Sequence, residues 1–209
     1  MKNLQSIIQE KLRLSKDTKV DIYNYHPKTR EELRKILEER LASNPDANLN
    51  DIDVSNITDM GPDASNIGLF ENLDPHNIDI SEWNVSNVTN MGYMFDRCEN
   101  FNSDLSKWDV SNVINMDSMF YKCKNFNSDL DNWDVSNVTN MYSMFYKCKN
   151  FNSDLSKWDV SNVKNMYSMF YNSIFNGDIS EWDVSNVKNM YDMFKNSPLE
   201  KNPPKWYKP

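Results

Sequence analysis

A chain of 209 residues is long enough to bury a sizeable hydrophobic core, as one domain or two small ones. Its 31 acidic residues outnumber its 23 basic ones, and the resulting net charge of −8 argues against free nucleic acid as a ligand. Nowhere do apolar residues run together for the length of a membrane-spanning helix, so we expect no membrane span.

The first residues of the chain bear on its location. They contain no uninterrupted apolar stretch of the length found in signal peptides. As it stands, the chain is therefore expected to be cytoplasmic. A leader upstream of Met1 would instead place the protein at the cell surface.

Residues 1–48 do not repeat, and they predict a helix, a strand and a second helix. Apolar residues from Leu4 to Leu12 lie on one helical face, residues 19–25 alternate as in a strand, and Thr29 and Glu32 have capping-box spacing before a second apolar helical face. Because the end of a repeat array exposes apolar side chains, we expect residues 1–48 to form a cap. A repeat domain over 49–197 and a closing tail over 198–209 would follow.

Tryptophans set the period of the repeat. They lie 25 residues apart, with a final spacing of 24, at Trp83, Trp108, Trp133, Trp158 and Trp182. Residues 101–113 and 151–163 are identical in sequence, and a degenerate first copy begins at Ile52. A fixed period of this length predicts a solenoid, here of about six rungs.

Within one repeat, the apolar spacing changes from that of a strand to that of a helix. Residues 105–110 end in strand alternation, whereas Met116, Met119, Phe120 and Cys123 follow the spacing of a helical turn. We therefore expect an α/β repeat solenoid in which each rung is a short strand plus a short helix or 3₁₀ segment.

The repeat resembles the leucine-rich repeat, and specifically that of the BspA-like bacterial surface proteins. Met-Phe-x-x-Cys elements occur at residues 94–98, 119–123 and 144–148, and Trp-Asp-Val-Ser-Asn-Val-x-Asn-Met is typical of repeats in mycoplasma-type and other bacterial proteins. Ile52, residues 61–67 and Ser173 depart from the pattern. The resemblance implies a leucine-rich-repeat-like fold and a protein-binding or adhesive role.

Few residues are suited to catalysis or to metal binding. Cys98, Cys123 and Cys148 recur at one repeat position without a Cys-x-x-Cys pair or a nearby histidine, so we expect a column of buried, reduced thiols and no metal site. With only His26 and His76, and four glycines that form no phosphate-binding loop, we expect neither a cofactor nor an enzyme.

Aspartates form two columns, one before each expected strand and one within it. Stacked carboxylates repel one another, so each needs a compensating interaction. One interpretation is that they accept backbone N–H bonds in turns. The alternative is a row of acidic sites for calcium or a basic partner, of which calcium is the less expected because the repeat lacks Gly-containing acidic loops.

Binding residues are sought where the repeats differ, because residues that maintain the fold recur in every copy. One candidate surface is rich in tyrosine, a residue enriched at interfaces: Tyr93, Tyr121, Tyr142, Tyr146, Tyr167, Tyr171 and Tyr191. The other is the expected strand face, where leucine-rich repeats commonly bind: Lys107, Asp109, Asp134, Lys157, Asp159 and Asp183. An equally open interpretation is that the tyrosines merely stack on one another and shield the flank.

Two non-enzymatic functions fit these features. The first is a protein-interaction module, with a bacterial surface adhesin as one form of it. The second is an acidic intracellular inhibitor or decoy, of the kind phages use against host defence, that blocks a nucleic-acid-processing enzyme. In each case the expected partner is another protein, and a monomer is favoured.

Overall fold

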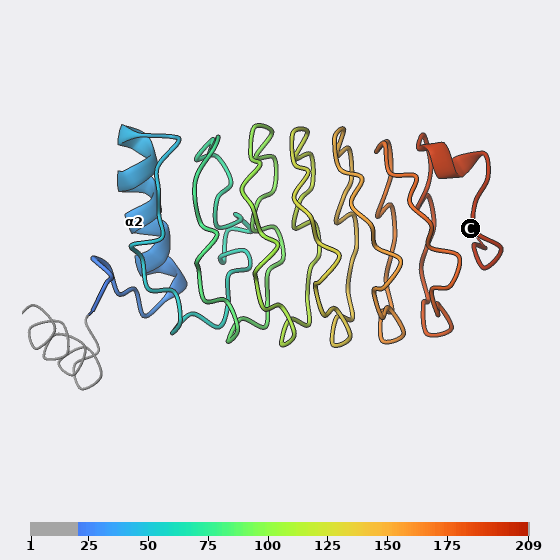
Figure 1. Ribbon diagram of the computed structural model, residues 1–209, viewed down its shortest axis with the longest axis horizontal. Coiled ribbons are helices and arrows are strands. Elements are labelled where there is room, and N and C mark those ends of the chain that lie inside the picture. The colour runs from blue at the N-terminus through green and yellow to red at the C-terminus, as the bar shows by residue number, and fades with distance from the viewer. Residues whose placement is uncertain (1–20, 209) are drawn as a thin grey trace, which may run out of the picture.

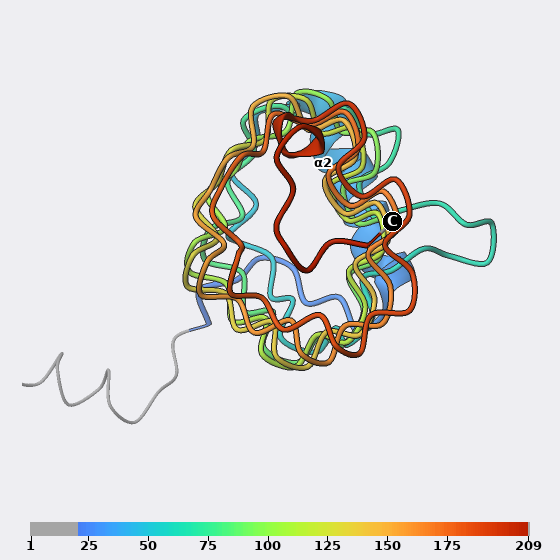
Figure 2. The same ribbon diagram turned by 90° about the vertical axis from the view of Figure 1, so that its right-hand side faces the viewer.

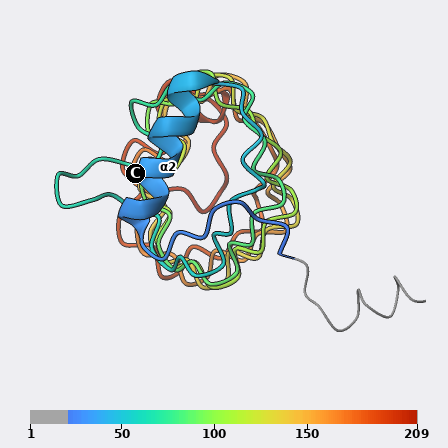
Figure 3. The same cartoon turned by 90° about the vertical axis from the view of Figure 1, so that its left-hand side faces the viewer.

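The computed structural model describes residues 21–208, in which the repeats lie one on another as successive turns of the chain (Figure 1). Helix α2, Arg30–Ser43, lies at one end of the stack, and the 3₁₀ helix η1, Pro198–Glu200, lies at the other. Seen from either end, the turns overlap around a common interior (Figures 2 and 3). Within residues 21–208, no helix is long and apolar enough to cross a membrane.

The expected α/β leucine-rich-repeat-like solenoid is wrong, because the repeats in residues 21–208 contain neither strands nor α-helices. Successive turns are joined by isolated parallel bridges in one column, whose residues are Asp59, Asn90, Asn115, Asn140, Asn165 and Asn189. The first two turns share a second bridge, between Asn48 and Asp79. The strand expected over residues 19–25 is reduced, in its described part, to one bridge between Tyr25 and Ile52. The helix expected near Leu4–Leu12 lies outside the described residues.

The segment from Met116 to Cys123 shows why helical spacing does not give a helix. Ser118 and Lys122 have left-handed φ angles of 53° and 61°, and their counterparts in the other tryptophan-containing repeats are also left-handed. Alternate N–H groups then donate to the next turn of the chain, including Ser118 to Tyr142 O and Lys122 to Tyr146 O, each at 2.7 Å. The intervening N–H of Tyr121 donates back to Ser118 O at 3.1 Å. The segment is therefore a run of tight turns in which a side chain faces the interior every third or fourth residue.

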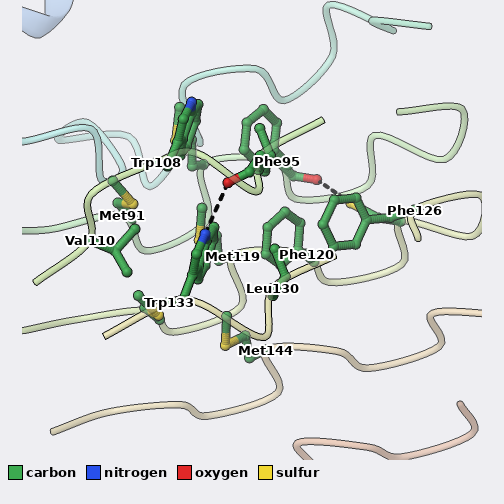
Figure 4. Packing of buried hydrophobic residues seen from close by; sticks show 14 of the residues in the cluster. Met91, Phe95, Trp108, Val110, Met119, Phe120, Phe126, Leu130, Trp133 and Met144 are labelled. Atoms are coloured by element: carbon green, nitrogen blue, oxygen red, sulfur yellow. Dashed lines mark hydrogen bonds between the residues drawn. The ribbon is translucent and has the colours of Figure 1, made fainter. Parts of the chain in front are cut away.

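Columns of identical side chains fill the interior. Trp83 and Trp108 stack with ring centroids 6.4 Å apart, and Phe120 and Phe145 with centroids 5.7 Å apart. Each tryptophan indole N–H also donates to a carbonyl of the preceding turn, as from Trp133 to Leu105 O at 3.0 Å (Figure 4). Aromatic stacking and a satisfied indole together give every turn the same contact with its neighbour.

Asparagine columns tie the turns together at their rim. The side-chain amide of Asn137 donates to Ser111 O at 2.8 Å, and four other asparagines repeat this bond at the same distance: Asn87, Asn112, Asn162 and Asn186. The asparagines of this column therefore maintain the fold by bonding to the backbone of the preceding turn.

The cysteines are buried and free, as expected. The thiol of Cys123 lies 3.0 Å from Phe95 O, and that of Cys148 lies 3.0 Å from Phe120 O. Burial raises the pKa of the thiols of Cys98, Cys123 and Cys148, which keeps them protonated and able to donate.

The second helix expected from the sequence is confirmed as α2. The Thr29 side chain accepts from the Glu32 N–H at 3.2 Å, as the capping pattern predicts. Its Leu33, Leu37 and Leu41 join the hydrophobic core of the stack. Arg30, on the same helix, is buried and donates to Gly61 O and Ile67 O, so the helix also anchors the irregular loop that projects from the stack (Figure 3).

The asparagine column yields the first prediction. Asn137→Ala removes the bond to Ser111 O and should lower the free energy of unfolding by about 1 kcal/mol. Asn132→Ala changes an equally exposed asparagine of the same turn, one that forms no hydrogen bond with another described residue, and should cost less than about 0.5 kcal/mol. Urea unfolding of both variants measures the difference, and equal costs would show that the column does not join the turns.

Candidate binding surfaces

The tyrosine surface comprises Tyr93, Tyr121, Tyr142, Tyr146, Tyr167, Tyr171 and Tyr191, and six of these form two ladders. In the first, Tyr146 stacks between Tyr121 and Tyr171 with ring centroids 4.6 and 4.8 Å apart. In the second, Tyr167 stacks between Tyr142 and Tyr191 at 5.1 and 6.0 Å. The tyrosines therefore do stack on one another, and most are half-buried.

Tyr93 belongs to neither ladder. It takes the repeat position that Ser118, Ser143 and Ser168 occupy in later turns, with a left-handed φ of 57°. The tyrosine surface therefore draws on two adjacent repeat positions, because Tyr142 aligns with Gly92 and not with Tyr93. Burial, assisted by the nearby Asp117 carboxylate, raises the pKa of Tyr93.

Cations accompany the first ladder. The ammonium groups of Lys122 and Lys147 lie 5.1 and 5.3 Å from the ring centroids of Tyr121 and Tyr146, within cation–π distance. The tyrosine hydroxyls of both ladders make no hydrogen bond to another residue in the described part of the chain. The surface thus presents rows of free hydroxyls beside ordered positive charges.

Both ladders end at a carboxylate on the side toward α2. Asp96 takes the ladder position of Tyr121 in the preceding turn, and Asp117 takes that of Tyr142. Asp96 is 6% exposed, and its Oδ1 is the one buried side-chain oxygen or nitrogen in residues 21–208 without a hydrogen-bond partner. Arg97 Nε lies 3.6 Å from its Oδ2. Burial, reinforced by the negative charge of Glu71 and opposed by Arg97 and Lys122, raises the pKa of Asp96 to about 6.

The second candidate surface was assigned to a strand that is absent from the described residues, so we name it the turn surface: Lys107, Asp109, Asp134, Lys157, Asp159 and Asp183. Its aspartates accept the N–H two residues on, at 3.1 Å for Asp109 and 3.0 Å for Asp134. The aspartates of the other column do the same: Asp104 accepts from the Ser106 N–H at 2.9 Å. The interpretation that the aspartates serve as turn acceptors is confirmed. Accordingly, hydrogen bonds from Ser111 lower the pKa of Asp109, which stays ionised.

The lysines of the turn surface are already paired. Lys107 lies 2.7 Å from Glu82, and Lys157 lies 3.4 Å from Asp131, in each case one turn back. Because both pairs are exposed, they add little to stability, but they neutralise part of the acidic surface.

Sequence reasoning missed one polar cluster. His26 lies on the surface between two carboxylates, with Nε2 at 2.9 Å from Asp21 and Nδ1 at 3.6 Å from Asp53. The two aspartates come from segments that are joined by the bridge at Tyr25 and by neighbouring hydrogen bonds, which sequence spacing could not show. Both imidazole nitrogens therefore face carboxylates. Nowhere in residues 21–208 do three His, Cys, Asp or Glu side chains gather so as to hold a metal ion.

Comparison with known proteins finds one family. The family model described as "Mycoplasma protein of unknown function, DUF285" matches residues 31–139 and 125–207. This agrees with the resemblance to mycoplasma-type repeats inferred from the tryptophan elements, at the level of the family. No curated protein and no solved structure matches the chain.

The buried carboxylate predicts an unusual dependence of stability on pH. In the folded protein Asp96 holds its proton up to about pH 6, whereas in the unfolded chain it ionises near its ordinary pKa of 3.8. The free energy of unfolding therefore falls as pH rises between these values. Above about pH 6 the protein carries the full free-energy cost of the buried, ionised carboxylate. Asp96→Asn should raise stability by about 1–3 kcal/mol at pH 7.5 and leave it unchanged near pH 3.5.

Thermal unfolding at both pH values measures this effect, with Asp104→Asn as the control. Hydrogen bonds from Ser106 lower the pKa of Asp104, so this substitution should destabilise at pH 7.5 and lose its effect in acid. An Asp96→Asn protein no more stable than the wild type at pH 7.5 would contradict the burial of an uncompensated charge.

Proposed function

Since the chain belongs to this repeat family of unknown function, we propose a function from its surfaces: it is a non-enzymatic protein that binds another protein through the tyrosine surface. The observation that supports this most directly is the pair of ladders, whose hydroxyls have no partner among the described residues. Hydroxyls that no other described residue satisfies are available to form hydrogen bonds with another molecule.

Stacking makes the surface inexpensive to bind. The Tyr146 ring lies 4.6 Å from that of Tyr121 and 4.8 Å from that of Tyr171, so most of the rotational freedom of these rings is already lost before a partner arrives. Immobilising a side chain at an interface otherwise costs about 0.5–1.5 kcal/mol. Preordered tyrosines therefore offer contact area and hydrogen bonds at a reduced entropic cost.

The lysines favour a partner that carries carboxylates. Lys122 and Lys147 lie over the first ladder, and Lys195 lies 6.0 Å from the ring centroid of Tyr171 at its far end. The protein as a whole has a net charge of −8, so this group of lysines forms a local positive region on an otherwise acidic molecule. An acidic protein surface would complement it and would be repelled by the turn surface.

A second candidate uses the turn surface instead. Hydrogen bonds within their own turns lower the pKa of Asp109, Asp159 and Asp183, so negative charges are available to a basic protein, as an inhibitor or decoy of a nucleic-acid-processing enzyme would require. A role at the bacterial cell surface, in adhesion, is a form of the first proposal and would use the tyrosine surface.

The tyrosine proposal is tested with Tyr142→Ala combined with Tyr167→Ala, two rings that stack at 5.1 Å. We expect at least a tenfold loss of partner protein captured from an extract of the producing cells, quantified by mass spectrometry. Because stacking is lost, the free energy of unfolding should also fall by about 1–2 kcal/mol. Tyr142→Phe with Tyr167→Phe keeps the stack and should show a smaller loss of capture.

Lys107→Ala with Lys157→Ala, on the turn surface, is the matched control and should capture as well as the wild type. If the same proteins are captured at unchanged levels by the double alanine variant, the tyrosine surface is not the interface.

The turn-surface candidate is tested by Asp109→Asn, Asp134→Asn, Asp159→Asn and Asp183→Asn together. The change is compatible with the fold because Asn84, in the same column, already accepts the Ser86 N–H at 3.2 Å. If this surface binds a basic partner, capture should fall in the variant and should weaken steeply as salt rises from about 0.05 M to about 0.5 M. If capture is the same in the variant and at high salt, the turn surface is not the interface.

A further inference from the structure

The stack ends differently at its two termini. At the first turn, Val54, Ile57 and Met60 are at most 2% exposed, because α2 and the preceding segment cover them. At the last turn, the equivalent Val184, Val187 and Met190 are only partly buried. One end of the stack is closed and the other is open.

The tail covers only part of the open end (Figure 2). Trp206 extends the tryptophan column, with its ring centroid 6.3 Å from that of Trp182, and donates to Ile179 O at 2.9 Å. Tyr207 packs edge-on against Phe194 at 4.9 Å. The tail thus completes the tryptophan and phenylalanine columns and leaves the valine and methionine columns uncovered.

A groove of about 660 Å³ occupies the uncovered part, between the last turn and the tail. Val184, Val187, Met190 and Trp206 give it an apolar lining, and Lys188, Lys205 and Lys208 lie along it. The groove therefore combines apolar surface with a positive rim.

The inner repeats show what covers this surface elsewhere. In the turn before, Val160, Val163 and Met166 are at most 1% exposed, because the last turn lies on them. Their covering segment follows the pattern Val-x-x-Val-x-x-Met, here residues 184–190. The equivalent surface of the last turn, formed by Val184, Val187 and Met190, has no such segment lying on it in the described part of the chain.

The backbone of the last turn is likewise ready for one more segment. One turn earlier, Ser161 O accepts from the Asn186 amide, Lys164 O accepts from the Lys188 N–H, and the Met166 N–H donates to Asn189 O, each at 2.8 Å. The equivalent groups are the carbonyls of Ser185 and Lys188 and the N–H of Met190. Within residues 21–208 these three groups form no hydrogen bond to a following turn.

We propose that the groove binds an extended, acidic peptide segment of another protein, of the form Val-x-x-Val-x-x-Met, which continues the stack by part of a turn. The valines and methionine would cover Val184, Val187 and Met190, an asparagine would donate to Ser185 O, and carboxylates would face the lysine rim. This is strand addition in principle, carried out on turns instead of a sheet edge. A second copy of the chain is not the occupant, because its own repeat segments are packed and its first turn is covered by α2.

The probe is an acetylated, amidated, fluorescently labelled peptide with the sequence of residues 134–141, Asp-Val-Ser-Asn-Val-Thr-Asn-Met. Titration of the full chain, followed by fluorescence anisotropy, should show saturable binding with a Kd of roughly 10–1000 µM, as expected of so short a segment. A peptide in which both valines are replaced by aspartate should not bind.

Val187→Lys places a charge in the groove and should weaken binding at least tenfold. Ile114→Lys is its matched control: Ile114 is exposed, and Lys164 and Lys188 occupy the same column in other turns, so binding should be unchanged. If Val187→Lys lowers the unfolding temperature, Met190→Lys tests the same groove at a second position. Tyr142→Ala with Tyr167→Ala should leave peptide binding intact, which separates this site from the tyrosine surface.

Absence of saturable binding to the wild type, or binding that survives both groove variants, would overturn the proposal. Concentration-dependent dimerisation of the wild type that is lost in Val187→Lys, measured by analytical ultracentrifugation, would also overturn it by assigning the groove to a second copy.

Discussion

The hydrogen bonds that alternate N–H groups donate from each turn to the next determine the architecture of this protein. In the segment that begins at Met116, these bonds require a left-handed residue at Ser118 and another at Lys122. Such a conformation costs about 1–2 kcal/mol for a non-glycine residue, so it persists only where the surroundings compensate. Here the compensation is an inter-turn bond of 2.7 Å at each of these two residues, which a helix would not form because its N–H groups donate within the helix.

Stacking turns at one fixed spacing places every residue beside its own copies, and this decides which side chains are tolerated. Aromatic rings, thiols and side-chain amides stabilise this arrangement, because they stack on their copies or donate hydrogen bonds to the preceding turn. Carboxylates do not, and the aspartates are accommodated by facing outward and accepting N–H groups of their own turns. Asp96, which takes the place of a tyrosine at the end of the first ladder, is buried and has no such N–H donor among the described residues. Its pKa is raised for that reason.

The period, the interior columns, the reduced cysteines and helix α2 could be predicted from the sequence, because each depends on spacing or on local capping. The internal structure of a turn could not. Met116, Met119, Phe120 and Cys123 have the spacing of a helix, but that spacing records only which side chains face inward, and a run of tight turns satisfies it equally well.

The direction of the inter-turn bonds also distinguishes the two ends of the stack. The left-handed segments donate toward the C-terminal end, whereas the asparagine amides donate toward the N-terminal end, so within residues 21–208 the Met190 N–H and the carbonyls of Ser185 and Lys188 are left without a partner from a following turn. An apolar surface alone would accept many partners, but donors and acceptors in this fixed order accept a chain of one polarity and one register. Tyr191, which ends the second ladder and lines the groove, joins the two surfaces. A protein that occupied the tyrosine surface could therefore extend a single segment into the groove, and binding at one surface would raise the effective concentration at the other.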